Sequence, residues 1–172
     1  MFNEYSQTPL QLAVFKGSFQ TVLAMYASNM FDFSIMTNDG YSLLDLAFKG
    51  KSYNTIKFLK SIGQITNYKP EIMAILLESK KYEITKTYIE EFDFVPELLI
   101  LATQKKNFEI ARYLVIEKGY NPTNRLPEQL SPLELAYQNK DRYMLSLYMS
   151  FSKEIIGDLD TIYQYLDSPD SV

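Results

Sequence analysis

The residues that could support chemistry in this chain are few. Ser150 and Lys153 fit the S-x-x-K spacing of serine–lysine acyl-enzymes, but no partner motif accompanies them. The chain has no Cys and no His, so thiolate nucleophiles, the usual general base near neutral pH and the common zinc ligands are all missing. There is no Gly-rich phosphate loop and no dinucleotide-binding fingerprint. We therefore predict no catalytic residues, no metal site and no cofactor, and a protein that is not an enzyme.

The C-terminal residues 151–172 combine an apolar pattern with a polar tail. Apolar side chains recur at spacings of three or four between residues 151 and 166, which predicts a capping helix. Asp158, Asp160 and Asp167 are expected on its solvated side, because a metal site needs more convergent oxygens than this pattern offers. We expect a flexible tail at 168–172, whose alternative interpretation is a ligand for a PDZ domain.

The composition of the chain limits which classes of partner and which cellular location we expect. Hydrophobic residues make up 47% and charged residues 22%, an ordinary globular balance. The net charge of −4 gives no attraction to phosphate backbones, so we expect no nucleic-acid partner. No apolar run approaches the roughly 20 residues that span a bilayer, and the N-terminal residues lack the layout of a signal peptide. We therefore expect no membrane span and a cytoplasmic location.

A short motif recurs along the chain at a fixed spacing. The copies are TPLQLA at 8–13, SLLDLA at 42–47, the looser ELLILA at 97–102, and SPLELA at 131–136. The final alanines are 34 residues apart from Ala13 to Ala47, and again from Ala102 to Ala136. A period of this length is typical of repeat proteins, in which each repeat stacks on its neighbours.

A weaker copy fits in the gap between the second motif and the looser one. Residues 76–84, LLESKKYEI, match the pattern of residues 102–110, ATQKKNFEI, with Leu76 in the place of the alanine. Because the step from Leu76 to Ala102 is only 26 residues, this repeat must lack most of its connecting loop. The sequence thus predicts five repeats, near residues 5–36, 37–69, 70–95, 96–126 and 127–150, within a domain that covers 1–150.

Each repeat is predicted to be a pair of helices. Thr8 and Ser131 each precede a Pro, which is the order of an N-cap and a first helical position. A second segment follows the alanine and carries apolar side chains at spacings of three or four. Polar or Gly-bearing stretches such as 37–40 and 120–124 connect successive repeats. Strands of the right length are absent, so we predict an all-α fold with short hairpin-like loops.

These copies resemble the ankyrin repeat, whose signature is T-P-L-H-x-A followed by a Gly. TPLQLA with Gly17 carries the resemblance most closely, and NDGYS at 38–42 is similar to the loop that leads into the next repeat. The resemblance covers roughly residues 5 to 150 and is strongest in the first, second and fifth repeats. It implies an ankyrin-repeat solenoid, in which small alanines let the first helices of neighbouring repeats approach closely.

The chain departs from the signature at several positions. The His of the family is replaced by Gln11, Asp45 and Glu134, so other acceptors must supply its turn hydrogen bond. Leu43 stands where the second repeat would carry Pro, and Gly50 falls one place early.

The resemblance implies a module that binds another protein through a concave face, with no small-molecule substrate. That face would be built from hairpin tips and the ends of the first helices, where Tyr and Phe make good anchors. The alternative for each position is a solvated surface side chain. The predicted partner-binding residues are Phe15 and Lys16 in the first repeat, Asn38, Asp39, Tyr41 and Lys49 in the second, Gln104 and Lys105 in the fourth, and Gln138 and Asn139 in the fifth.

Two further expectations concern the biological setting. The Asn-, Lys-, Ile- and Tyr-rich composition is similar to that of ankyrin arrays in intracellular bacteria, large viruses and protists, which favours a host-directed effector. Residues 126–130, LPEQL, resemble the opening of an F-box, a short helical motif that recruits ubiquitin ligases. The alternative function is therefore an adaptor that brings a partner to such an enzyme, although the same residues also serve as the lead-in to SPLELA.

Overall fold

The computed structural model describes residues 7–156, 160, 163 and 164. Within this part, all regular structure is helical, with ten α-helices and one π-helix and no strand, which confirms the predicted all-α class. The chain divides into two compact units, residues 1–93 and residues 94–172, hereafter the N-terminal and C-terminal units.

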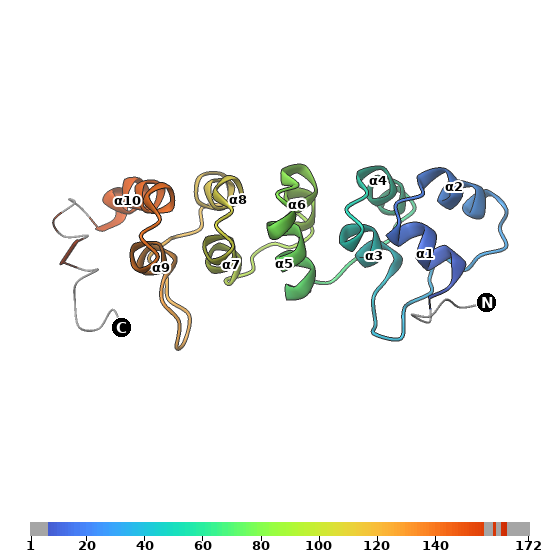
Figure 1. The fold of residues 1–172 in the computed structure, drawn as a ribbon, viewed down its shortest axis with the longest axis horizontal. Coiled ribbons are helices and arrows are strands. Elements are labelled where there is room, and N and C mark those ends of the chain that lie inside the picture. Colours follow the sequence, from blue (N-terminus) through green and yellow to red (C-terminus); the bar gives the residue numbers. More distant parts are fainter. Residues whose placement is uncertain (1–6, 157–159, 161–162, 165–172) are drawn as a thin grey trace. The chain divides into compact units, whose positions relative to one another are not determined.

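The N-terminal unit contains three helix pairs. They are α1 (Pro9–Phe15) with α2 (Phe19–Ala27), α3 (Leu43–Lys49) with α4 (Tyr53–Ser61), and α5 (Pro70–Ser79) with α6 (Tyr82–Ile89). In this unit α1, α3 and α5 form one row and α2, α4 and α6 another (Figure 1). Helix α3 packs against both α1 and α5, so the first helices share a continuous core.

The C-terminal unit contains two more helix pairs. They are α7 (Leu98–Gln104) with α8 (Phe108–Arg112), which continues as the π-helix Tyr113–Glu117, and α9 (Pro132–Gln138) with α10 (Arg142–Ile156). The capping helix was expected to begin at residue 151, but residues 151–156 continue α10. Asp158, Asp167 and the tail 168–172 lie outside the described residues. Asp160 is exposed, as predicted, and Tyr163, which belonged to the predicted apolar pattern, is also exposed.

Three first helices begin with the same reciprocal cap. The hydroxyls of Thr8, Ser42 and Ser131 accept the backbone N–H three residues on, and the side chain at that later position accepts the N–H of the cap. The later positions are Gln11, Asp45 and Glu134, the residues that replace the His of the signature. Their side chains are buried, and they supply the acceptors whose presence the sequence required.

The alanine positions of the motif lie in the core, as their small size suggested. Ala47, Ala102 and Ala136 are fully buried, and so is Leu76, which takes the same place in the third repeat. The second helices bury apolar side chains at helical spacing against them. These side chains are Val22, Ile56, Leu59, Ile84, Tyr88, Ile110, Leu114, Met144 and Tyr148.

Glu134 links stability to pH. It is buried, and Arg125 from the preceding loop donates to it from Nε at 3.0 and 3.1 Å and also from a second guanidinium nitrogen. Burial raises the pKa of Glu134, but the hydrogen bonds from Arg125 and Ser131 outweigh burial and hold the pKa below its usual 4.5.

Because its folded pKa is lowered, Glu134 stabilises the fold fully above its unfolded pKa, and this contribution disappears as the pH falls through the folded pKa. We expect Glu134→Gln to flatten the loss of thermal stability between about pH 5 and pH 3, because the Gln side chain takes up no proton in this range. The variant keeps the capping box, as Gln11 does in the first repeat. Melting followed by circular dichroism across that range measures the effect. Equal slopes for the variant and the wild type would contradict it.

The connections between repeats differ in length, and the long ones carry the polar hairpins. Residues 28–42 and 118–131 are long connections, whereas the third helix pair is flanked by the shorter 62–69 and 90–97. Within the second long connection, residues 126–130 form a turn closed by a bond from Gln129 N to Leu126 O of 3.1 Å. Because an F-box is helical, this turn gives the F-box interpretation no support.

Candidate functional site

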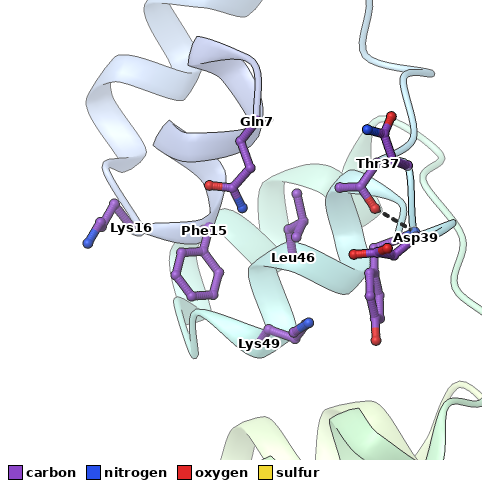
Figure 2. A pocket seen from close by; sticks show the side chains of 9 residues that line it. Gln7, Phe15, Lys16, Thr37, Asp39, Leu46 and Lys49 are labelled. Atoms are coloured by element: carbon purple, nitrogen blue, oxygen red, sulfur yellow. Dashed lines mark hydrogen bonds between the residues drawn. The ribbon is translucent and has the colours of Figure 1, made fainter. Parts of the chain in front are cut away.

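A hollow of about 550 Å³ opens on the N-terminal unit between two successive repeats. Its walls come from the segment before α1, the C-terminal end of α1, the hairpin at 37–41 and helix α3. Figure 2 shows Phe15 and Leu46 between Gln7 and Lys49, with Asp39 and Thr37 on the far side from Lys16. The complete lining is Gln7, Phe15, Lys16, Thr37, Asn38, Asp39, Tyr41, Leu46 and Lys49.

The hairpin wall is held by a tight turn. Thr37 N donates to Tyr41 O at 2.9 Å, Tyr41 N donates to the Thr37 hydroxyl at 3.0 Å, and Gly40 N closes the turn on Thr37 O at 3.0 Å. Gly40 has φ +75°, the left-handed conformation that Gly adopts most easily. The turn leaves Asn38 and Asp39 exposed at its tip and directs the chain into the capped start of α3.

The opposite wall depends on close approach of backbones. Gly50 follows α3, and a Cβ on it would overlap the carbonyl group of Phe15 at the end of α1. Absence of a side chain at Gly50 therefore lets α1 pack closely against α3. Phe15 is brought in this way to the same hollow as Leu46 and Lys49.

Tyr41 is fixed on several sides. The Lys49 amine lies 3.9 Å from the centre of its ring, and the Lys69 amine lies 5.7 Å from it. Its hydroxyl donates to Glu71 Oε1 at 2.9 Å, across to the start of α5. This bond, with burial and nearby carboxylates, raises the pKa of Tyr41, so the phenol stays protonated at neutral pH. For Glu71, its backbone N–H and then the Tyr41 hydroxyl are the main causes that lower the pKa, and it stays ionised.

A partly buried ion pair lies near Tyr41 of the hollow. Asp45 is 1% exposed, and its Oδ2 lies 3.1 Å from the Lys69 amine. Ser42 N donates to the same oxygen at 2.8 Å, and the Thr66 hydroxyl donates to Oδ1. The pair joins the cap of α3 to the residue before α5, so it ties the second repeat to the third.

The structure brings together some of the predicted partner-binding residues and separates others. All six positions predicted in the first two repeats line the hollow. Gln104 and Lys105 lie at the end of α7, Gln138 and Asn139 at the end of α9, and all four are exposed in the C-terminal unit.

Sequence reasoning missed three residues of the lining. Leu46, at 3% exposure, serves both as core and as floor of the hollow. Thr37 and Gln7 were not chosen, although Thr37 begins the polar stretch that predicted the loop. It also missed Lys69 and Glu71, because only folding brings the start of α5 to the hairpin of the previous repeat.

The most exposed aromatic side chains of the N-terminal unit lie elsewhere. Tyr26 and Tyr53 are each 44% exposed and belong to the second helices, α2 and α4. Tyr26 contacts Phe33 and Phe58 edge-on, each with ring centres 5.2 Å apart. The two aromatic rings of the hollow, Phe15 and Tyr41, are half-buried. The aromatic anchors of the hollow are therefore partly covered rings, and the more exposed rings lie on the second helices.

Comparison with solved structures decides the fold. The crystal structure of the ankyrin repeat domain of Bcl-3, a member of the IkappaB protein family, matches with a TM-score of 0.64 at 18% identity, over 86% of this chain and 73% of that one. The ankyrin repeat domain of human ASB11 matches with a TM-score of 0.63 at 15% identity, over 86% and 69%. The chain has the ankyrin-repeat fold. No protein-family model and no curated protein sequence matches it.

The ankyrin-repeat fold accounts for the place of the hollow, between a hairpin tip and the ends of two first helices. Among the described residues, no group of three or more His, Cys, Asp or Glu side chains could hold a metal ion. The Ser150 hydroxyl of the S-x-x-K pattern lies on α10 and donates to Ser146 O at 2.8 Å. In the described part of the chain, no helix is both long and apolar enough to cross a membrane. The geometry of the hollow is suited to holding a few side chains of another molecule.

Proposed function

We propose that this chain binds another protein through the hollow of its N-terminal unit. The observation that carries the proposal is the convergence of the hairpin tip and the ends of α1 and α3 on one cavity of about 550 Å³. A cavity of this size accommodates a few side chains. The half-buried rings of Phe15 and Tyr41 provide large contact area, and Tyr is enriched in binding hot spots. The Lys49 amine on the Tyr41 ring adds a positive charge.

The proposed setting of this binding rests on the sequence alone. We propose that the protein acts in the cytoplasm, and that its partner is a host protein if the chain is an effector. A capture experiment from eukaryotic lysate addresses the second point, because it offers host proteins to the hollow.

The test is affinity capture with three forms of the chain, with bound proteins identified by mass spectrometry. The hollow variant carries Phe15→Ala, Tyr41→Ala and Lys49→Glu. The matched control carries Tyr53→Ala and Lys57→Glu, because these residues form a similar pair on α4, with the amine 5.5 Å from the ring centre. Circular dichroism checks that both variants are folded.

We expect the wild type and the control to retain a common partner, and the hollow variant to bind it at least about 30-fold more weakly, as loss of a hot spot of about 2 kcal/mol implies. Equal capture by the wild type and the hollow variant would place the binding surface elsewhere. If no specific partner is captured, the proposal that the hollow binds a protein of that lysate is rejected.

A further inference from the structure

The hollow is lined by one more positive than negative charge, in a protein whose net charge is negative. Its lining contains two lysines, Lys16 and Lys49, and one carboxylate, Asp39, whereas the whole chain carries −4. An excess of positive charge in a concave site attracts groups of the opposite sign. The local charge therefore favours a partner segment that carries a carboxylate.

Lys49 is the amine best placed to meet that carboxylate. Among the described residues it has no ion-pair partner, and its amine rests on the Tyr41 ring. The other amine near this ring, that of Lys69, is already paired with Asp45. Glu71 is near enough to feel the charge of Lys49, but its own hydrogen bond comes from the Tyr41 hydroxyl.

An apolar surface lies directly beside this amine. Phe15 and Leu46 form the middle of the hollow, between Gln7 and Lys49 (Figure 2). Leu46 is held in the core and Phe15 by the close packing of α1 on α3, so the surface is preorganised. Asp39, exposed on the hairpin, disfavours a second carboxylate on its side and so gives the site a direction.

We propose, on the basis of the protein-binding function above, that the hollow recognises a partner segment in which Asp or Glu lies next to Leu, Met or Phe. The carboxylate contacts the Lys49 amine, and the apolar side chain packs on Phe15 and Leu46. Lys49 is then the residue that determines specificity for charge, while Phe15 supplies contact area.

The test uses the full chain, immobilised and exposed to a displayed library of short random peptides. Wild type, Lys49→Glu and the control Lys57→Glu, an exposed lysine of α4, are compared. We expect the wild type and Lys57→Glu to enrich peptides with an acidic residue beside an apolar one. Lys49→Glu should shift the preference to Lys or Arg beside an apolar residue, and it should bind a synthetic copy of the wild-type peptide at least about tenfold more weakly.

Three outcomes would overturn this inference. They are enrichment of basic or purely apolar peptides by the wild type, an acidic preference that survives Lys49→Glu, and absence of any enriched motif. None of them decides the broader proposal, because capture of whole proteins measures binding without regard to peptide motif. Conversely, failure of hollow-dependent capture would reject the broader proposal even if acidic peptides were enriched.

Discussion

Replacing Lys69 by Met is expected to lower the free energy of unfolding by about 3 kcal/mol, and to lower the melting temperature by about 10 °C. The reason is that the carboxylate of Asp45, 1% exposed, would lose the cation that lies beside it in the core. Removal of one partner of a buried ion pair commonly costs about 3–5 kcal/mol. The lower end applies here because the Ser42 N–H and the Thr66 hydroxyl still donate to the carboxylate.

Two further variants make this prediction specific. Lys60→Met removes a surface pair with Glu91, where the lysine side chain is 38% exposed, and should change stability by less than about 1 kcal/mol. Adding Asp45→Asn to Lys69→Met should restore most of the loss, because Gln11 shows that an amide suffices in the capping box. Urea unfolding followed by circular dichroism gives all the values. A Lys69→Met variant as stable as Lys60→Met would refute the role of the pair.

Replacing Gly50 by Ala is expected to destabilise the N-terminal unit by about 3 kcal/mol or more. Gly50 has φ −76°, a conformation that Ala adopts freely, so on backbone grounds alone the change would be mildly stabilising. The added Cβ, however, would overlap the Phe15 carbonyl group, and a rigid backbone cannot move aside as a flexible side chain can. Packing therefore decides the sign, and α1 must shift away from α3.

The matched control is Gly63→Ala. Gly63 has φ +82° with no atom within 4 Å of an added Cβ, so the change should cost only about 1–2 kcal/mol of backbone strain. Gly50→Ala should also weaken partner capture, because the shift carries Phe15 out of the hollow, whereas Gly63→Ala should not. Thermal melts and capture measured together check both effects. If Gly50→Ala is no less stable than Gly63→Ala, the close approach of α1 and α3 is not essential.

Much of the fold could be predicted from local signals. Thr8 and Ser131 with the prolines that follow them fixed where two first helices begin, because N-cap hydrogen bonds and the conformation of Pro act within one turn. The 34-residue spacing of small alanines indicated stacked helix pairs, and the buried alanines confirm that they lie in the core.

Features that depend on the irregular path of the backbone were beyond prediction. The periodic apolar pattern of Tyr113–Glu117 predicts an α-helix, but the structure has a π-helical turn, with Lys118 N bonded to Tyr113 O at 3.2 Å. Tyr113 and Leu114 are buried in the π-helical turn, and an apolar pattern does not distinguish this turn from an α-helical one. Likewise, an apolar pattern that continues through residues 151–156 does not say whether a new helix begins or α10 runs on.

The site was predictable as a set of positions but not as a chemical environment. Hairpin tips and ends of first helices follow from the repeat, and these positions in the first two repeats line the hollow. The pairing of Lys69 with Asp45, and of Glu71 with Tyr41, joins residues more than twenty positions apart. No local pattern encodes such contacts. The pairing of Lys69 with Asp45 leaves Lys49 as the amine available beside the Tyr41 ring.

Site-specific photo-crosslinking tests the central claim most directly. A photoreactive amino acid is placed at Asn38, at the exposed hairpin tip, and, in a separate variant, at Asn54, which is also exposed on α4. Both are irradiated in lysate under the same conditions. Binding through the hollow predicts a covalent adduct with a partner protein from Asn38 and none from Asn54. An adduct from Asn54 alone would show that the partner binds the second helices, and would contradict the proposed binding surface.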